Sequence, residues 1–151
     1  MSTSTLAVPA PTDDAAILAV IDTMRDALFT KDPHKFVSGF TADAAVFNLA
    51  PPLMHCGVDL SEKKAWFDSW LTPIELEPRD FKVTVSGDYA FAHGFLRLAG
   101  TKKGSEGKVN FWMRETVCLR KQQGDWRIVH EHTSVPFYMD GTFRPAFDLQ
   151  P

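Results

Sequence analysis

The sequence has 151 residues, of which 44% are hydrophobic and 23% charged, and its formal net charge is −3. A chain of this length and composition is typical of one globular domain with a full core. The acidic balance and the scattered Lys and Arg residues argue against a nucleic-acid surface, and no apolar run approaches the ~20 residues that cross a membrane. Two cysteines, Cys56 and Cys118, are too few for a disulfide framework, so we expect a cytoplasmic protein.

The first residues predict a flexible arm followed by a helix. Residues 1–12 are rich in Ser, Thr, Ala and Pro and lack the basic and apolar regions of a secretory signal. We therefore expect an N-terminal arm over residues 1–12 and a single domain over residues 13–151. Asp13 is favourable at the start of a helix. An apolar stripe at helical spacing follows it, made of Ile17, Ile21, Met24 and Leu28.

Two shorter helices are predicted after the first. Asp32 can cap the second helix and Pro33 can open it, and we extend this helix to Phe40. Ser61 can cap a third helix over residues 61–71, which Pro73 terminates.

The remaining segments alternate apolar and polar residues, which predicts β-strands. These strands are expected over residues 44–49, 81–86, 89–100, 109–121 and 126–135. Helices followed by a meander of long strands indicate an α+β fold. A strongly curved antiparallel sheet wrapped around the N-terminal helices would bury the apolar faces of both and leave an apolar pocket at its open end.

Three segments carry a resemblance to a known family: FTADAAVFN, VNFWMRETVCLRKQQGDWRIVHEHTSVPF and PFYMDGTFRPAFDL. The chain from residue 13 onward resembles the nuclear-transport-factor-2-like superfamily in its SnoaL-like, ketosteroid-isomerase-like branch. The resemblance implies a cone-shaped, cystatin-like fold that encloses a pocket for a small hydrophobic ligand. It also implies a homodimer through the outer face of the sheet. Isomerases, cyclases, dehydratases and non-catalytic modules share this cone, so the fold alone does not define a function.

The resemblance argues against steroid isomerase activity. Ketosteroid isomerase uses an Asp base, with a Tyr and a protonated Asp as hydrogen-bond donors to the oxyanion. In this sequence the base position falls on Asn48, the Tyr position on Met24 and the acidic donor position near Thr116. An amide cannot accept a proton from carbon near neutral pH, so we expect that authentic steroid isomerase activity is absent.

Other polar side chains are candidates for the pocket. If Thr116 faces inward, strand alternation also turns Trp112 and Arg114 inward. Arg114 would then hold a carboxylate or an oxyanion. The alternative is that Arg114 pairs with Glu131 and only satisfies the sheet. Both interpretations stay open from the sequence.

The last strand contains the sequence His130-Glu131-His132. Comparison with relatives implies that Glu131 faces into the cone and that both histidines face outward. Glu131 or His132 is the candidate base, while His130 fits a structural role at a subunit contact. A metal site is the third alternative, because two histidines on one face supply only part of a ligand set.

Three further residues are candidate ligand contacts: Trp66, Trp70 and His93. The two tryptophans fit the core most simply, and they could also stack on a flat ligand at the pocket mouth. His93 shares a strand face with aromatic residues, and the sequence does not decide whether that face is inside.

The first hypothesis is therefore a SnoaL-like protein that binds a small hydrophobic carbonyl or carboxylate compound. If it is an enzyme, it acts by proton transfer without a cofactor, with Glu131 or His132 as base and Arg114 as the cation. The second hypothesis is a non-catalytic ligand-binding or assembly module, and a metal-dependent enzyme using His130 and His132 is the third. Neither nucleic acid nor membrane is expected as a partner.

Overall fold

The computed structural model describes residues 11–151, so the predicted arm lies almost wholly outside the described residues. The helices are α1 (Asp13–Thr30), α2 (Pro33–Ser38) and α3 (Leu60–Asp68). Helix α1 starts and carries its buried stripe where the sequence predicts. Thr12 caps α1, because its hydroxyl accepts a hydrogen bond from the amide of Ala15 at 3.3 Å.

Helices α2 and α3 differ from the predictions at their ends. Asp32 caps α2 as predicted, but the helix stops at Ser38, and Phe40 instead begins a strand. Asp59, rather than Ser61, caps α3 by accepting a hydrogen bond from the amide of Glu62 at 2.8 Å. A carboxylate at this position accepts more strongly than a hydroxyl and suits the positive end of the helix dipole.

Six strands follow the helices or lie between them. They are β1 (Phe40–Phe47), β2 (His55–Cys56), β3 (Glu75–Ser86), β4 (Tyr89–Gly100), β5 (Val109–Gln122) and β6 (Asp125–Ser134). The long strands lie where alternation predicts them, although β3 begins well before the predicted start at residue 81. The two-residue strand β2 was not predicted, because two residues are too few for an alternation pattern.

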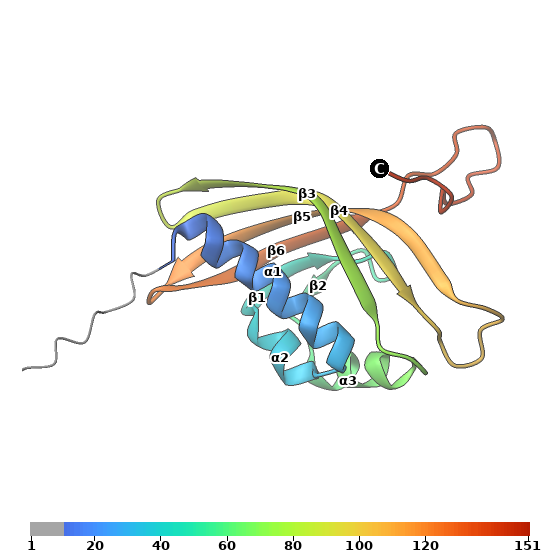
Figure 1. Ribbon diagram of the computed structural model, residues 1–151, viewed down its shortest axis with the longest axis horizontal. Coiled ribbons are helices and arrows are strands. Elements are labelled where there is room, and N and C mark those ends of the chain that lie inside the picture. The colour runs from blue at the N-terminus through green and yellow to red at the C-terminus, as the bar shows by residue number, and fades with distance from the viewer. Residues whose placement is uncertain (1–10) are drawn as a thin grey trace, which may run out of the picture.

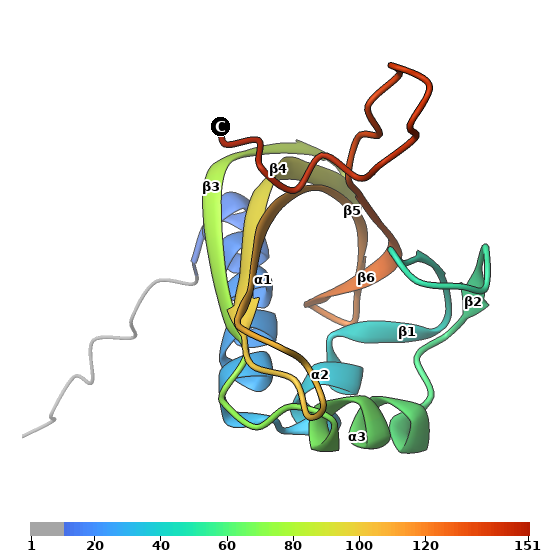
Figure 2. The same ribbon diagram turned by 90° about the vertical axis from the view of Figure 1, so that its right-hand side faces the viewer.

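The strands form one curved, unclosed sheet in the order β2-β1-β6-β5-β4-β3. All neighbouring pairs are antiparallel except β1 and β6, which run parallel. Figure 2 shows the sheet as an arch with α1 on its concave side and with α2 and α3 across its base. This arrangement is the predicted α+β fold, in which a bent sheet wraps around N-terminal helices (Figure 1).

Strand alternation sends one face of the sheet into the core. On β5 the buried positions are Met113, Glu115, Val117 and Leu119, while the residues between them are exposed or only partly buried. Helix α1 covers this face with its own buried stripe, which runs from Ile17 to Leu28. None of the helices within residues 11–151 is long and apolar enough to cross a membrane.

The C-terminal segment after β6 runs along the outside of the arch and loops away from it (Figures 1 and 2). The ring of Phe147 packs on the ring of Phe111 with 4.5 Å between centroids. The hydroxyl of Tyr138 donates a hydrogen bond to Asp148 at 2.6 Å. Several large apolar side chains of this segment are nevertheless exposed, with Met139 at 82% the most exposed of them.

Candidate functional site

Two carboxyl groups lie on the concave face of the sheet, one on β5 and one on β6. Glu115 lies between the buried Met113 and Val117 and is only 7% exposed. Glu131 pairs in register with Val117 on β5 and with the buried Val46 on β1. Neighbours directly opposite in a sheet point to the same face. Both glutamates therefore point inward, and Glu131 does so as the sequence comparison implied.

The side chains of Glu115 and Glu131 share a hydrogen bond, which requires a proton on one of them. Burial, the negative charge of Glu131 and this hydrogen bond raise the pKa of Glu115 well above its usual value. Burial also raises the pKa of Glu131, but the hydrogen bond from Glu115 and the charges of Lys63 and His130 oppose that rise. The stable arrangement is therefore a protonated Glu115 that donates to the carboxylate of Glu131.

Helix α3 supplies a cation to the same interior. Lys63, Trp66 and Phe67 lie on one face of the helix because they are three and four residues apart. The Nζ atom of Lys63 lies 4.1 Å from the ring centroid of Phe36 and 4.8 Å from that of Trp66. Burial lowers the pKa of Lys63, and the nearby Glu131 carboxyl partly offsets that effect.

Three side chains of this region keep some exposed surface. Lys63, Trp66 and Glu131 are partly rather than fully buried. The enclosed apolar pocket of the sequence analysis stays a prediction.

The predicted inward orientation of Arg114, Trp112 and Thr116 is wrong. Arg114 and Thr116 are exposed on the convex face of the sheet. The Nε atom of Arg114 donates a hydrogen bond to Ser134 at 3.1 Å. Trp112 lies on the same face as Arg114, and the guanidinium of Arg79 lies 4.5 Å from its ring centroid. The physical reason is the alternation of β5, in which the apolar odd-numbered residues face the core and turn the even-numbered residues outward.

The predicted histidines lie on the convex face as well. His132 is exposed, and the Nδ1 atom of His130 lies 2.8 Å from the carbonyl oxygen of Ala45. Their rings are 4.9 Å and 5.4 Å from the ring of Phe47, His130 being the nearer. His93 is exposed on β4 and therefore does not line the interior. Within the described part of the chain, no group of three or more His, Cys, Asp or Glu residues is placed to hold a metal ion.

The other candidate ligand contacts are divided between core and surface. Asn48 is exposed immediately after β1, whereas Met24 is buried on α1. Trp66 is partly buried beside Lys63, and its ring lies 5.6 Å from that of the buried Trp70. Of the predicted site residues, Glu131 and Trp66 therefore lie near Lys63 on the inner side of the arch.

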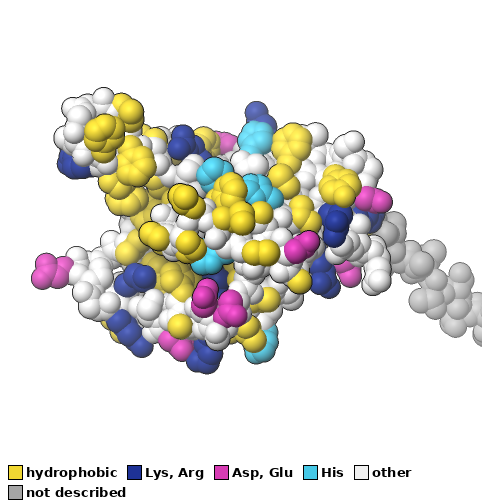
Figure 3. All heavy atoms as spheres, turned by 180° about the vertical axis from the view of Figure 1, so that it is seen from behind, with side chains coloured by type: hydrophobic (Ala, Val, Ile, Leu, Met, Phe, Trp, Pro, Cys, Tyr) yellow, Lys and Arg dark blue, Asp and Glu magenta, His cyan; other side chains and the backbone are white. Residues whose placement is uncertain are grey.

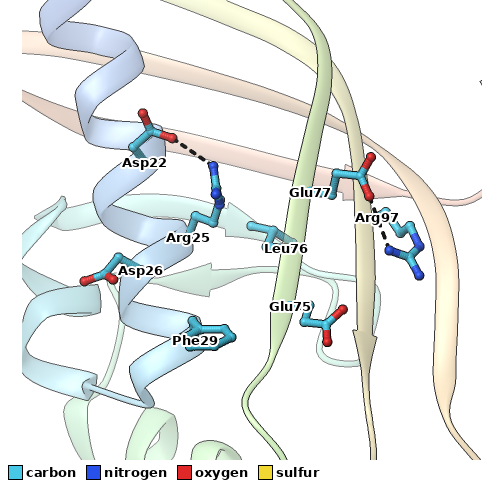
Figure 4. A pocket seen from close by; sticks show the side chains of 8 residues that line it. All are labelled: Asp22, Arg25, Asp26, Phe29, Glu75, Leu76, Glu77 and Arg97. Atoms are coloured by element: carbon cyan, nitrogen blue, oxygen red, sulfur yellow. Dashed lines mark hydrogen bonds and ion pairs between the residues drawn. The ribbon is translucent and has the colours of Figure 1, made fainter.

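Two open depressions lie on the surface of residues 11–151. One, of about 600 Å³, lies between α1 and β3 and contains charged side chains that include Arg25, Glu75 and Arg97 (Figure 4). The acidic groups there are neutralised locally, since Asp22 pairs with Arg25 at 3.4 Å and Glu77 pairs with Arg97 at 3.2 Å. The other depression, of about 850 Å³, lies on the convex face around His93, Phe95 and Arg114. Neither contains the Glu131 carboxyl or Lys63.

Sequence reasoning missed Glu115 and Lys63. The signal for Glu115 was present, because it is a charged residue between two apolar residues of the same strand face, Met113 and Val117. The family resemblance placed the acidic donor near Thr116, one residue away from Glu115. Neighbouring residues of a strand point to opposite faces, so this shift put the donor on the wrong face. Lys63 had no comparable signal, since a lysine on a short helix is usually exposed.

Comparisons with known proteins agree with this architecture. The sequence model of the SnoaL-like domain matches residues 17–138. An NTF2-like protein of unknown function from Pseudomonas putida is 27% identical, with a TM-score of 0.79, and the match covers 93% of this chain and 99% of that one. No curated protein matches the sequence significantly.

Two further solved structures share the fold at lower identity. A candidate ketosteroid isomerase from Shewanella frigidimarina has a TM-score of 0.65 at 19% identity, covering 80% of this chain and 96% of that chain. A candidate scytalone dehydratase from Novosphingobium aromaticivorans has a TM-score of 0.72 at 14% identity, and the match covers 88% of this chain and 90% of that chain. These two likenesses concern the fold only. With the family match over most of its length, the chain belongs to the SnoaL-like domain family and has an NTF2-like fold.

Proposed function

We propose that this protein binds a small hydrophobic compound with a carbonyl or carboxylate group in the interior of the arch and transfers a proton on it. The observation that carries the proposal is the hydrogen-bonded pair Glu115–Glu131 on the concave face. Two carboxyl groups whose surroundings hold them in different protonation states are suited to act as acid and base. The surrounding core is apolar, which suits a hydrophobic ligand.

The two glutamates have different roles in this proposal. Glu131, as a carboxylate, removes a proton next to the carbonyl carbon of the ligand. Glu115, as a neutral acid, donates a hydrogen bond to the oxygen that becomes negative. Arg114 and His132 are not part of this chemistry, because both side chains are exposed on the other face of the sheet.

The same proposal includes a homodimer and a cytoplasmic location. The convex face has exposed aromatic side chains, among them Phe91 at 44% and Phe95 at 36%. Figure 3 shows histidine and hydrophobic side chains together in the middle of the face turned away from α1. Such a face is favourable for a subunit contact. Two free cysteines support a reducing compartment.

A non-catalytic binding module is the second candidate function. An inward Arg114–Glu131 pair that neutralises itself would have favoured it, but Arg114 lies outside and binds Ser134. The interior instead has a base together with a partly buried lysine, and this combination supports chemistry more than passive binding.

The test is deuterium exchange at the α-carbon of hydrophobic ketones and aldehydes, beginning with acetophenone, followed by NMR in heavy water. We expect exchange faster than in buffer alone, and a rate about 10²–10⁴-fold lower in Glu131→Gln. Glu106→Gln is the matched control, because Glu106 is exposed in the loop between β4 and β5. Exchange that is no faster than in buffer across the set, or that is equal in Glu131→Gln, would show that the proposed proton transfer does not occur.

A further inference from the structure

The chain after β6 forms a hairpin over residues 136–146, which we call the C-terminal hairpin. Two backbone hydrogen bonds close it. The amide of Tyr138 donates to the carbonyl oxygen of Arg144 at 2.9 Å, and the amide of Ala146 donates to that of Pro136 at 2.8 Å. The hairpin therefore has a defined shape of its own, and docking it on a surface costs little conformational entropy.

The apolar side chains of the C-terminal hairpin lie in solvent. Met139 is 82% exposed, Phe143 62% and Phe137 58%. Phe137 pairs with Pro145, and this register places Met139 opposite Phe143, so the two side chains share one face. An isolated two-stranded hairpin is marginally stable at best in water. We therefore expect a protein surface to cover this face.

The hairpin projects on the side of the molecule that has the convex depression, the hollow of about 850 Å³ around His93, Phe95 and Arg114. Figure 2 shows the hairpin standing off the convex side of the arch at the upper right. It begins two residues after Ser134, which accepts the hydrogen bond from Arg114, a residue that lines the depression. The 82% exposure of Met139 shows that the hairpin does not fill the depression of its own chain.

The charges of the hairpin and of the convex depression are complementary. The exposed charged side chains of the depression are Lys82, Arg114 and Asp80. Within the described residues neither of the two cations is in an ion pair. The hairpin has one exposed charge of each sign, on Asp140 and Arg144. Its carboxylate can therefore meet the cations of the depression while its guanidinium meets the acid.

From these observations we infer that two copies of the chain exchange C-terminal hairpins, each inserting Met139 and Phe143 into the convex depression of the other copy. The apolar pair then lies against Phe95, and Asp140 lies beside the two cations. Each copy has the hairpin and the depression on the same side, so a two-fold axis makes the two contacts equivalent. The inference rests on the proposed homodimer and identifies the segment that each subunit contributes to the contact.

Photo-crosslinking from the hairpin tests the inference directly. The photoreactive residue p-benzoylphenylalanine is placed at position 139, the protein is irradiated, and covalent dimers are isolated by denaturing electrophoresis and mapped by peptide mass spectrometry. We expect a covalent dimer in which position 139 is joined to β4 or β5 near Phe95 or Thr116. Position 71 is the control, because Leu71 is also an exposed apolar residue, at 62%, but follows α3 at the base of the arch (Figure 2).

Two outcomes of this experiment would overturn the inference. One is the absence of a covalent dimer from position 139, and the other is a cross-link to a part of the second copy outside the convex face. We expect no covalent dimer from position 71.

A second measurement separates the exchange of hairpins from the proposed dimer itself. Sedimentation equilibrium is compared for Met139→Lys and for the matched control Leu71→Lys. We expect Met139→Lys to raise the dissociation constant at least about tenfold, because it buries a further cation beside Lys82 and Arg114 of the other copy. Leu71→Lys should leave the dissociation constant unchanged. A dimer unaffected by Met139→Lys would leave the homodimer in place and refute the exchange of hairpins, whereas a monomeric unaltered protein would refute both.

Discussion

Glu115 is the residue whose surroundings determine the chemistry of the interior. It lies on a strand between two apolar residues and is almost inaccessible to solvent. An ionised carboxylate at this position would be unfavourable, both because water is excluded and because Glu131 is adjacent. The protonated form avoids both costs and gives Glu131 a hydrogen-bond donor.

The raised pKa of Glu115 predicts a pH-dependent stability. Its usual value is 4.5, and the folded value is higher. The folded state therefore retains a proton that the unfolded state has lost, so the free energy of unfolding falls as pH rises from the usual value through the raised one. Glu115→Gln keeps a donor and cannot ionise, so we expect its free energy of unfolding to rise relative to that of the unaltered protein as pH is raised from 5 to 8.

Urea denaturation at the two pH values measures this difference. Glu106→Gln is again the control, since replacing this exposed side chain should change the free energy of unfolding by the same small amount at both pH values. A Glu115→Gln effect that does not vary with pH would mean that Glu115 ionises normally in the folded protein.

Helix α3 is the element that brings the lysine to the glutamates. It has only nine residues, so its own backbone hydrogen bonds stabilise it weakly, and its first turn depends on the cap at Asp59. The Asp59 carboxylate accepts hydrogen bonds from the amide of Glu62 and from the hydroxyl of Ser61. These bonds, the one from Ser61 first, lower the pKa of Asp59 below its usual value.

Removal of the cap should destabilise the protein. We expect Asp59→Ala to lower the free energy of unfolding by about 1 kcal/mol. Asp59→Asn keeps an acceptor oxygen, so it should lower the free energy of unfolding by at most about 0.3 kcal/mol. Thermal or urea denaturation of the two variants under the same conditions makes the comparison. Equal losses would show that the cap does not contribute as the geometry indicates.

The elements also show what the sequence can and cannot predict. Periodicity located α1 and the long strands because each has a continuous apolar face. It failed at element ends, where Asp59 and Ser61 are both acceptable caps and only the fold selects between them. The orientation of Arg114 was predicted from the family resemblance, which placed the acidic donor near Thr116 instead of on Glu115, and a shift of one residue reverses a strand face. The proximity of Lys63 to Glu131 depends on how α3 folds back across the arch, and no local pattern encodes that.

At the scale of the whole molecule, the protein has two faces with different composition. The concave face holds the glutamate pair and the core, while the convex face has exposed aromatic side chains and histidines (Figure 3). An apolar face of this kind is unfavourable in water unless a partner covers it. A second copy of the chain satisfies this need in the proposed dimer.

The dimer has a direct test by sedimentation equilibrium. We expect the unaltered protein to be a dimer and Phe91→Glu to raise the dissociation constant at least about tenfold, because a charge would be buried at the contact. Leu18→Glu is the control, since Leu18 is a comparably exposed apolar residue on α1, at 43%. A monomeric protein, or one whose association is equally affected by both substitutions, would contradict a dimer through this face.

The proton held between Glu115 and Glu131 is the feature on which the proposed chemistry most depends, and carbon NMR observes it directly. With glutamate labelled at the carboxyl carbon, the chemical shift of each side chain reports its ionisation as pH is raised. We predict one carboxyl signal that stays protonated well above the usual value of 4.5 and disappears in Glu115→Gln. Deprotonation of every glutamate near 4.5 would contradict the account.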